Sequence, residues 1–258
     1  MRSRVVTVTL GVMAAVTVAG FFLLDMKGLD VGRSTVKLMR DLGTMLARPA
    51  AQHFTALDAL GSLAVTLCMG FLTTLIGAVP ALVLGLLAAR NLSRPAVVAV
   101  LKGFVAVIRA IPTVLWVLIF AIGAGLGSVA AIVGMSFHSF GYLLKAYAES
   151  FEEIDNDVIE ALKACGANRV QIVTRAIIPS SAGPLVSWTF MRFEINFTNA
   201  VAMGAAAGAG GIGFDLFMAS GFYFNIREVG AITWLILIVA AGLEIGATRL
   251  KSAQKVHK

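Results

Sequence analysis

Long runs without a charged side chain constrain this chain more than any other feature. Ala59–Ala89 contains no Asp, Glu, Lys or Arg, and neither does Ala110–Leu144. An α-helix needs about 20 apolar residues to cross the roughly 30 Å hydrocarbon core of a bilayer. Both runs exceed that length, so we expect membrane-spanning helices. The small-residue stretch 121–129 is expected to divide the second run into two spans.

The composition also favours a lipid environment. Of the 258 residues, 59% are hydrophobic and only 14% are charged, whereas soluble domains are about 25% charged. One membrane helix bundle is therefore favoured over soluble domains. The net charge of +7 is expected from basic cytoplasmic loops. The basic residues are scattered, which disfavours nucleic-acid binding, and the three His and two Cys show no metal-ligand spacing.

The hydrophobic pattern predicts an all-α, polytopic membrane bundle of about six transmembrane helices. The first apolar run, Val5–Leu24, follows two arginines and could be a signal peptide. It is longer than the usual apolar region of about 7–15 residues in such peptides, so we interpret it as a retained helix. The expected helices are about 4–24, 58–89, 96–122, 127–149, 181–207 and 229–249.

The positions of Lys and Arg predict the orientation of these helices. With the amino terminus in the cytoplasm, most basic residues are intracellular, and both termini lie inside. The outer loop 25–57 is basic and departs from this rule, and its segment 35–47 has the spacing of an interfacial amphipathic helix. We therefore expect an amino-terminal part, 1–57, a transmembrane domain, 58–249, and a basic cytoplasmic tail, 250–258.

The cytoplasmic loop 150–180 carries the strongest functional signal. Asp155 or its neighbour can cap a short helix, and Gly166 suits a left-handed helix end. Asn168 can cap a second helix, which we expect Pro179 to end. Such a pair of short helices can enter a groove on a partner. The alternative is an amphipathic loop that packs on its own bundle.

The spacing in this loop resembles the EAA loop of binding-protein-dependent ABC importer permeases. That family pattern is E-A-A, three residues, G, nine residues, then I-x-L-P. Leu162 replaces the second alanine, and Ala176 and Ile178 replace the isoleucine and the leucine, so apolar character is kept. The loop positions that correspond to the fixed letters of the E-A-A, G and P pattern are Glu160, Ala161, Leu162, Gly166 and Pro179.

Further stretches resemble the phosphonate-type permeases of this family. The resemblance covers roughly residues 58–249 and implies the type I ABC importer permease fold. It implies transport of phosphonate or a related oxyanion, phosphate or phosphite. The stretches are "GLLAARN" (85–91), "IRAIPTVLW" (108–116), "YAESFEEID" (147–155), "MRFEINFTNA" (191–200) and "GAGGIG" (208–213).

The resemblance also implies partners. These are a second permease chain, identical or a close paralogue, two cytoplasmic ATPase subunits that bind ATP and Mg, and a substrate-binding protein outside the bacterial inner membrane. The chain itself would then catalyse nothing and hold no cofactor. The EAA-loop residues would transmit force from the ATPases and would not touch substrate.

Polar residues inside the predicted spans are candidates for the translocation path. Arg192, Asn196 and Asn199 share one helix face, since they are four and three residues apart, and their positive end suits an oxyanion. Glu194 is expected to face another helix. Arg109 is a second candidate, although a side chain reaching the inner interface would also explain it. For the Arg192 stripe, contact between helices is the alternative to lining a path.

Glycines after the fifth predicted span match the dinucleotide pattern G-x-G-x-x-G, and Glu228 lies where that pattern expects an acid. The residues before them are alanines and glycines at a helix end, which differ from the β-strand that the pattern requires. In the resembled family this motif lies near the outer gate, so we assign packing and turns there. The gate glycines are Gly204, Gly208, Gly210, Gly211 and Gly213.

Alternative functions are a permease for another small solute, a stand-alone channel or secondary transporter, and a membrane enzyme using a dinucleotide.

Overall fold

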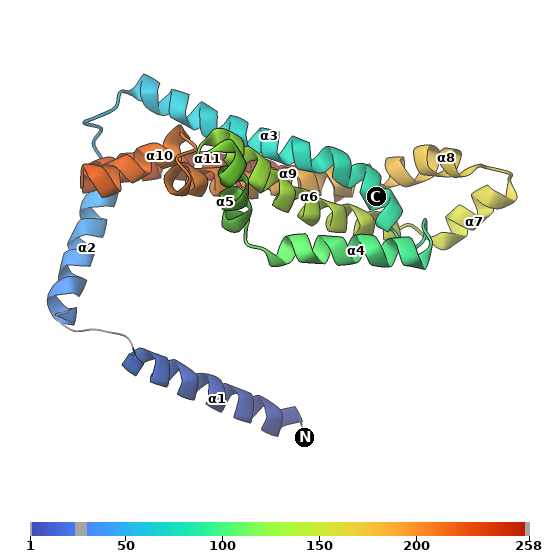
Figure 1. Ribbon diagram of the computed structural model, residues 1–258, viewed down its shortest axis with the longest axis horizontal. Coiled ribbons are helices and arrows are strands. Elements are labelled where there is room, and N and C mark those ends of the chain that lie inside the picture. Colours follow the sequence, from blue (N-terminus) through green and yellow to red (C-terminus); the bar gives the residue numbers. More distant parts are fainter. Residues whose placement is uncertain (1, 24–29, 256–258) are drawn as a thin grey trace. The chain divides into compact units, whose positions relative to one another are not determined.

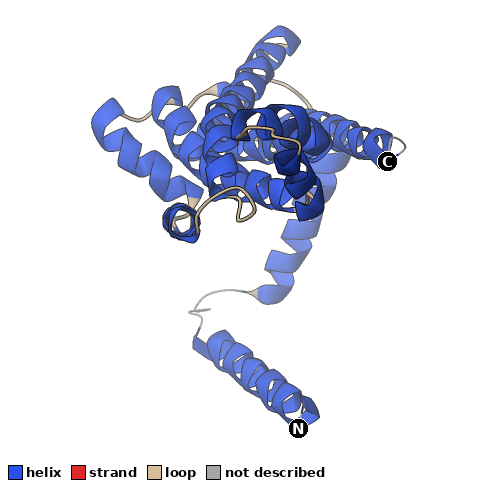
Figure 2. Cartoon of the chain, turned by 90° about the vertical axis from the view of Figure 1, so that its right-hand side faces the viewer, coloured by secondary structure: helices blue, strands red, loops and turns tan. Residues whose placement is uncertain are grey.

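The computed structural model describes residues 2–23 and 30–255, and these ranges contain helices and no strand (Figure 2). The predicted all-α fold class is confirmed. The chain divides into two compact units, Met1–Gly43 and Thr44–Lys258. The first residues of the predicted outer loop, 25–29, and the last of the predicted tail, 256–258, lie outside the described residues.

The first unit contains α1 (Arg2–Leu23) and most of α2 (Val31–Ala47). The 20 residues of α1 from Arg4 onwards are long and apolar enough to span a bilayer, and their side chains are exposed. Helix α2 covers the segment predicted to be helical at 35–47. The carboxylate of Asp30, just before α2, accepts a hydrogen bond of 3.0 Å from the Arg33 N–H in the first turn of that helix.

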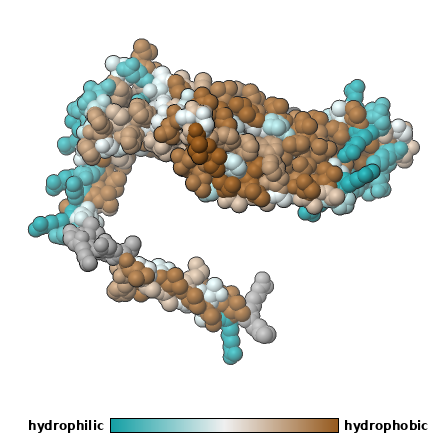
Figure 3. Space-filling model, viewed as in Figure 1, coloured by the Kyte–Doolittle hydropathy of each residue, from teal (hydrophilic) through white to brown (hydrophobic). Residues whose placement is uncertain are grey.

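The second unit is a helix bundle in which α3, α6 and α9 pack against one another (Figure 1). Hydrophobic residues cover much of its length, and hydrophilic residues gather at the end formed by α7 and α8 (Figure 3). Its helices are α3 (Ala56–Ala88), α4 (Pro95–Ala110), α5 (Thr113–Ala124), α6 (Ser128–Glu152), α7 (Asn156–Ala164), α8 (Arg169–Ile172), α9 (Ile178–Ala206), α10 (Gly211–Phe217) and α11 (Ile226–Lys255).

The predicted helix 96–122 is wrong as a single element, because α4 and α5 meet at an angle of 88°. Pro112 lies at the break and cannot donate a backbone hydrogen bond, and it disfavours helical geometry at the residue before it. Ile111 is accordingly extended, with φ −88° and ψ 122°. The Trp116 indole donates to the Ile108 carbonyl across the break, at 3.0 Å.

The prediction that Pro179 ends a helix is also wrong. Helix α8, a π-helical turn at Val173–Ile177 and α9 follow one another without interruption. Pro179 lacks an N–H, and the wider turn before it accommodates the missing bond, since the Ile178 N–H reaches back to the Val173 carbonyl.

The predicted outer loop 208–228 is largely helical too. It contains α10 and a π-helical turn at Met218–Phe222, and the segment Arg169–Ala206 bends by 44° to meet this pair. Within the described residues, four helices can cross a bilayer alone, namely α1, α3, α6 and α11. Counting each of the two bent pairs as one span raises the number to six, in agreement with the predicted bundle.

Small residues allow the central helices to approach closely. A Cβ atom added at Gly77 of α3 would lie 2.9 Å from the Phe140 nitrogen of α6. One added at Gly134 of α6 would lie 2.5 Å from the Val117 Cα of α5. Lipid provides no hydrophobic drive between helices, so close van der Waals packing over small residues stabilises the bundle.

A buried carboxylate ties the segment before α3 to the start of α11. The Glu228 side chain is 1% exposed, and its carboxylate accepts the backbone N–H groups of His53 at 2.7 Å and Gln52 at 3.3 Å. The His53 Nδ1 lies 2.7 Å from the same carboxylate, and its ring stacks on Tyr223. Glu228 therefore has a structural role at the place where the dinucleotide pattern would need a ribose ligand.

We expect Gly134→Ala to destabilise the purified protein by about 1–3 kcal/mol, because the added methyl group overlaps the α5 backbone. The matched control is Gly103→Ala on α4, where the added carbon would meet no described residue within 4 Å outside its own helix turn. Thermal unfolding in detergent measures the difference. Equal melting temperatures for the two variants would contradict close packing of α5 against Gly134.

Candidate functional site

Helices α7 and α8 form a hairpin at one end of the second unit (Figure 1). The Asp155 carboxylate caps α7 by accepting the Asp157 N–H at 3.0 Å. Gly166 has a φ of 82°, and its N–H donates to the Lys163 carbonyl at 2.9 Å. Asn168 caps α8 in a reciprocal pair with Gln171. Local sequence signals therefore form the hairpin.

The hairpin has an inner face that packs on its own bundle. Ile159 and Ile172 are buried in a hydrophobic core with Phe151 of α6, and Leu162 is half-buried against it. The Arg169 guanidinium donates to the Leu92 carbonyl and, at 3.3 Å, to the Ser93 hydroxyl. These contacts hold the hairpin against the turn between α3 and α4.

The outer face of the hairpin is uncovered. Glu160, Ala161 and Gly166 are exposed, and so is Val170, at 70%. Pro179 is exposed farther along the same continuous helix. Of the five predicted coupling residues, only Leu162 takes part in the bundle's packing, so the other four are free to meet a partner.

A buried polar junction (Thr74, Ser139, Arg192 and Asn196) joins the three central helices. The Asn196 amide donates to the Thr74 and Ser139 hydroxyls, both at 2.9 Å. The Arg192 Nε donates to the Ser139 hydroxyl at 3.1 Å. Arg192 and Asn196 thus share one face, as their spacing predicts. Asn199 and Glu194 are half-buried on the same helix.

Arg192 also belongs to an arginine cluster (Arg109, His138, Tyr142 and Arg192). The Cζ atom of Arg192 lies 5.1 Å from the centroid of the Tyr142 ring, and that of Arg109 lies 6.0 Å from it. His138 is one helical turn before Tyr142 on α6. Two predicted path residues from α4 and α9 therefore meet at one aromatic ring of α6.

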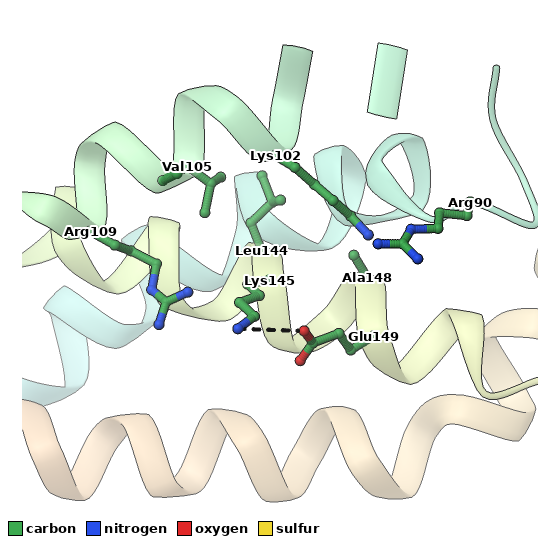
Figure 4. Close-up of a pocket in the computed structure, with 9 residues that line it drawn as sticks. Arg90, Lys102, Val105, Arg109, Leu144, Lys145, Ala148 and Glu149 are labelled. Atoms are coloured by element: carbon green, nitrogen blue, oxygen red, sulfur yellow. Dashed lines mark ion pairs between the residues drawn. The ribbon is translucent and has the colours of Figure 1, made fainter. Parts of the chain in front are cut away.

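A pocket of about 300 Å³ opens beside this cluster, between α4, α6 and the end of α3. Arg109 lies towards one end of it and Arg90 towards the other (Figure 4). Lys145 and Glu149 form an ion pair of 3.6 Å in its wall. Lys102, also in the wall, pairs with Glu152 at 2.8 Å. The pocket is therefore rich in cations, several of them already neutralised.

The gate glycines form the turn between α9 and α10. Gly208, Gly210 and Gly211 have φ values of 60°, 81° and 71°, which disfavour residues with a Cβ. Gly204 and Gly213 lie where α9 and α10 touch: a Cβ at Gly204 would meet the Gly210 carbonyl at 2.7 Å. A Cβ added at Gly208 would meet no atom within 4 Å among the described residues, so the close approach of α9 and α10 involves Gly204 and not Gly208. The residues before this turn are helical, which excludes the dinucleotide fold.

Comparison with known proteins identifies the chain's family. A family model described as binding-protein-dependent transport system inner membrane component matches residues 81–250. This range is well over half of the chain and contains all predicted coupling, path and gate residues. The chain belongs to this family. Its members are inner-membrane components of transport systems, so the chain is a multi-pass membrane protein of a transport system.

Two curated permeases are similar in sequence. The phosphate-import permease protein PhnE of Mycolicibacterium smegmatis is 30% identical over 237 residues, which cover 91% of this chain and 43% of that one. The phosphite transport system permease protein PtxC of Stutzerimonas stutzeri is 34% identical over 173 residues, 67% of this chain and 62% of that one. The chain thus spans less than two thirds of each relative.

A solved structure shares the fold. An inward-facing conformation of the MetNI methionine ABC transporter aligns with a TM-score of 0.66 and 24% identity, covering 76% of this chain and 95% of that one. The predicted type I ABC importer permease fold is confirmed by this likeness.

Three polar residues of the buried polar junction and the arginine cluster, Thr74, Ser139 and Tyr142, could not be identified from the sequence alone. Each lies in an apolar span and looks like an ordinary helix residue. A signal was nevertheless present in α6, since His138 and Tyr142 are four residues apart and Ser139 lies between them. That spacing places polar groups on one side of a membrane helix.

We expect Ser139→Ala to destabilise the permease by about 1–3 kcal/mol, because it leaves buried donors of Arg192 and Asn196 without an acceptor. Ser136→Ala is the matched control on the same helix, since among the described residues the Ser136 hydroxyl bonds only the Ile132 carbonyl of its own helix. Thermal unfolding of both variants in detergent checks this. A Ser139→Ala variant as stable as the control would show that the junction contributes little.

Proposed function

We propose that this chain is the permease subunit of an ATP-driven importer for a phosphorus oxyanion: phosphonate, phosphate or phosphite. The burial of Arg192 is the observation that supports this substrate class: the residue is only 2% exposed inside the bundle. Among residues 4–23 and 30–249, no carboxylate lies within ion-pair distance of Arg192 or Arg109. The relatives named for phosphate and phosphite support the same class.

The complete transporter would contain several chains. A second permease chain, identical or a close paralogue, completes the path. Two cytoplasmic ATPase subunits bind ATP and Mg, and an external binding protein delivers the substrate. The permease lies in the bacterial inner membrane with both termini and the hairpin in the cytoplasm. The uncovered outer face of the hairpin, with Glu160 and Ala161, supports docking to the ATPase.

Force would pass from the hairpin to the path along one helix. Helix α8, the π-helical turn and α9 are continuous from Arg169 to Ala206. Arg192 and Asn196 lie on that helix, and their hydrogen bonds reach α3 and α6. A displacement of α8 by the ATPase would therefore move the buried polar junction that joins α3, α6 and α9.

A permease for another small solute is the second candidate, favoured by the fold shared with a methionine transporter. A zwitterionic amino acid carries an ammonium group as well as a carboxylate. Arg192 and the second cation, Arg109, approach the same Tyr142 ring, and among residues 4–23 and 30–249 no carboxylate pairs with either of them. Such surroundings repel an ammonium group, so they favour an oxyanion.

Uptake by the complete transporter tests the proposed function. Cells that lack other phosphorus uptake and express the permease, its ATPase and its binding protein should accumulate radiolabelled phosphate or phosphite. Inactivating the ATPase should abolish accumulation. Unlabelled phosphate, phosphite and methylphosphonate should compete, and methionine should not. Uptake that persists without a working ATPase, or competition by methionine alone, would contradict the proposal.

Reversing the charge of Glu160 should uncouple the transporter. We expect Glu160→Arg to lower uptake by about tenfold or more, within the range of coupling energies of about 1–3 kcal/mol, while membrane insertion and ATPase activity persist. Lys37→Glu on α2, outside the family match, is the control for charge reversal. Immunoblots, ATPase assays and uptake are compared. Normal uptake by well-expressed Glu160→Arg would refute a coupling role.

A further inference from the structure

We infer that the arginine cluster is an oxyanion-binding site inside the bundle, next to the break between α4 and α5. The ligand class is a tetrahedral phosphorus oxyanion, held through its anionic oxygens by Arg109 and Arg192, with Tyr142 and His138 as further hydrogen-bonding groups. The inference rests on the proposed function and adds to it the residues that touch the substrate within the membrane.

The first argument is an incomplete hydrogen-bond inventory. The Arg192 Nη2 and the His138 Nδ1 are buried and have no hydrogen-bond partner within the part of the chain that the structure describes. The Ser139 hydroxyl satisfies only the Nε of Arg192. If Arg192 served only to join helices, the fold would be more stable with every guanidinium N–H bonded to a protein acceptor. An unused guanidinium donor, almost fully buried, points instead to a ligand.

The second argument is charge. A cation inside a membrane span costs about 3 kcal/mol or more unless it is compensated. Contact with the Tyr142 ring compensates Arg192 only in part, since a cation–π contact contributes about 0.5–2 kcal/mol. Arg109 adds a second positive charge at the same ring. An anion between the two guanidinium groups would relieve both the desolvation cost and their mutual repulsion.

The third argument is shape. Each guanidinium presents a planar fork of donors that matches the oxygens of a phosphoryl group. The two forks come from different helices, α4 and α9, and their Cζ atoms lie 6.0 and 5.1 Å from the centroid of the same ring of α6. Phosphate, phosphite and alkylphosphonates all present several oxygens on one phosphorus. The cluster therefore suits the group that these anions share.

The broken helix adds favourable electrostatics. Arg109 lies in the last turn of α4, and the 12-residue helix α5 begins at Thr113, two residues after the extended Ile111 at the break. The N-terminus of a helix carries a partial positive charge, and discontinuous membrane helices direct such ends at anionic substrates. Arg109 also lines the pocket shown in Figure 4. An anion leaving the cluster would thus enter a space that other cations line.

Anion-dependent stability tests the site without transport. The permease–ATPase complex, purified without the binding protein, is melted in phosphite, in methylphosphonate and in chloride at equal ionic strength. We expect both phosphorus anions to raise the melting temperature of the permease. Arg192→Met and Arg109→Gln should abolish most of that rise, and Arg33→Gln on the exposed surface of α2 should keep it. The ATPase subunits are common to all variants, so their own anion binding cancels.

The same experiment separates a binding site from a contact between helices. In chloride, Arg192→Met should be no less stable than the parent, because it removes a buried charge that lacks its ligand. Arg109 is exposed, so Arg109→Gln should fold normally and remains informative if Arg192→Met does not fold. A rise retained in both variants, or a permease stabilised by neither anion, would overturn the inference.

Uptake distinguishes failure of the site from failure of the proposed function. We expect Arg109→Gln and Arg192→Lys to lower the maximal rate of phosphite uptake by about tenfold, equivalent to about 1.4 kcal/mol, with unchanged protein levels. If the parent transporter moves no phosphorus oxyanion, the proposed function fails. If it does and both variants match it, only the intramembrane site fails.

Discussion

The hydroxyl of Ser139 is the interaction on which the centre of this permease depends. It donates to the Met135 carbonyl of its own helix at 2.8 Å and accepts from Arg192 and Asn196 of α9. Asn196 extends the network to Thr74 of α3. Three long helices are thereby fixed in register by polar contacts in a lipid environment, where small residues alone provide close packing and little specificity.

That junction also determines where charge can lie. The Nε of Arg192 is held by Ser139, so the rest of its guanidinium is directed to Tyr142, where Arg109 arrives from α4. Because the break at Pro112 turns α5 by 88° away from α4, α4 ends beside the middle of α6. A proline, a serine and close packing thus assemble two cations that are far apart in the sequence.

Local signals in the sequence predicted the hairpin well. Asp155, Gly166 and Asn168 act through neighbouring backbone groups, so their roles follow from positions a few residues away. The role of Pro179 did not follow in the same way. A proline ends a helix only if the turn before it cannot widen, and here a π-helical turn does so. The predicted helix 96–122 has its ends close to those of α4 and α5, but Pro112 breaks it in between.

By itself the sequence determined that this chain is an all-α membrane bundle, because uncharged apolar runs of this length are long enough to span a bilayer as helices and are stable in lipid. It also determined the family, through the spacing of the loop from Glu160 to Pro179 and a matching family model. Only the tertiary structure decided that Arg109 and Arg192 share one tyrosine, and that Glu228 ties α11 to the segment before α3. Spacing within one helix reveals a shared face, but contacts between helices depend on how closely their small residues let them pack.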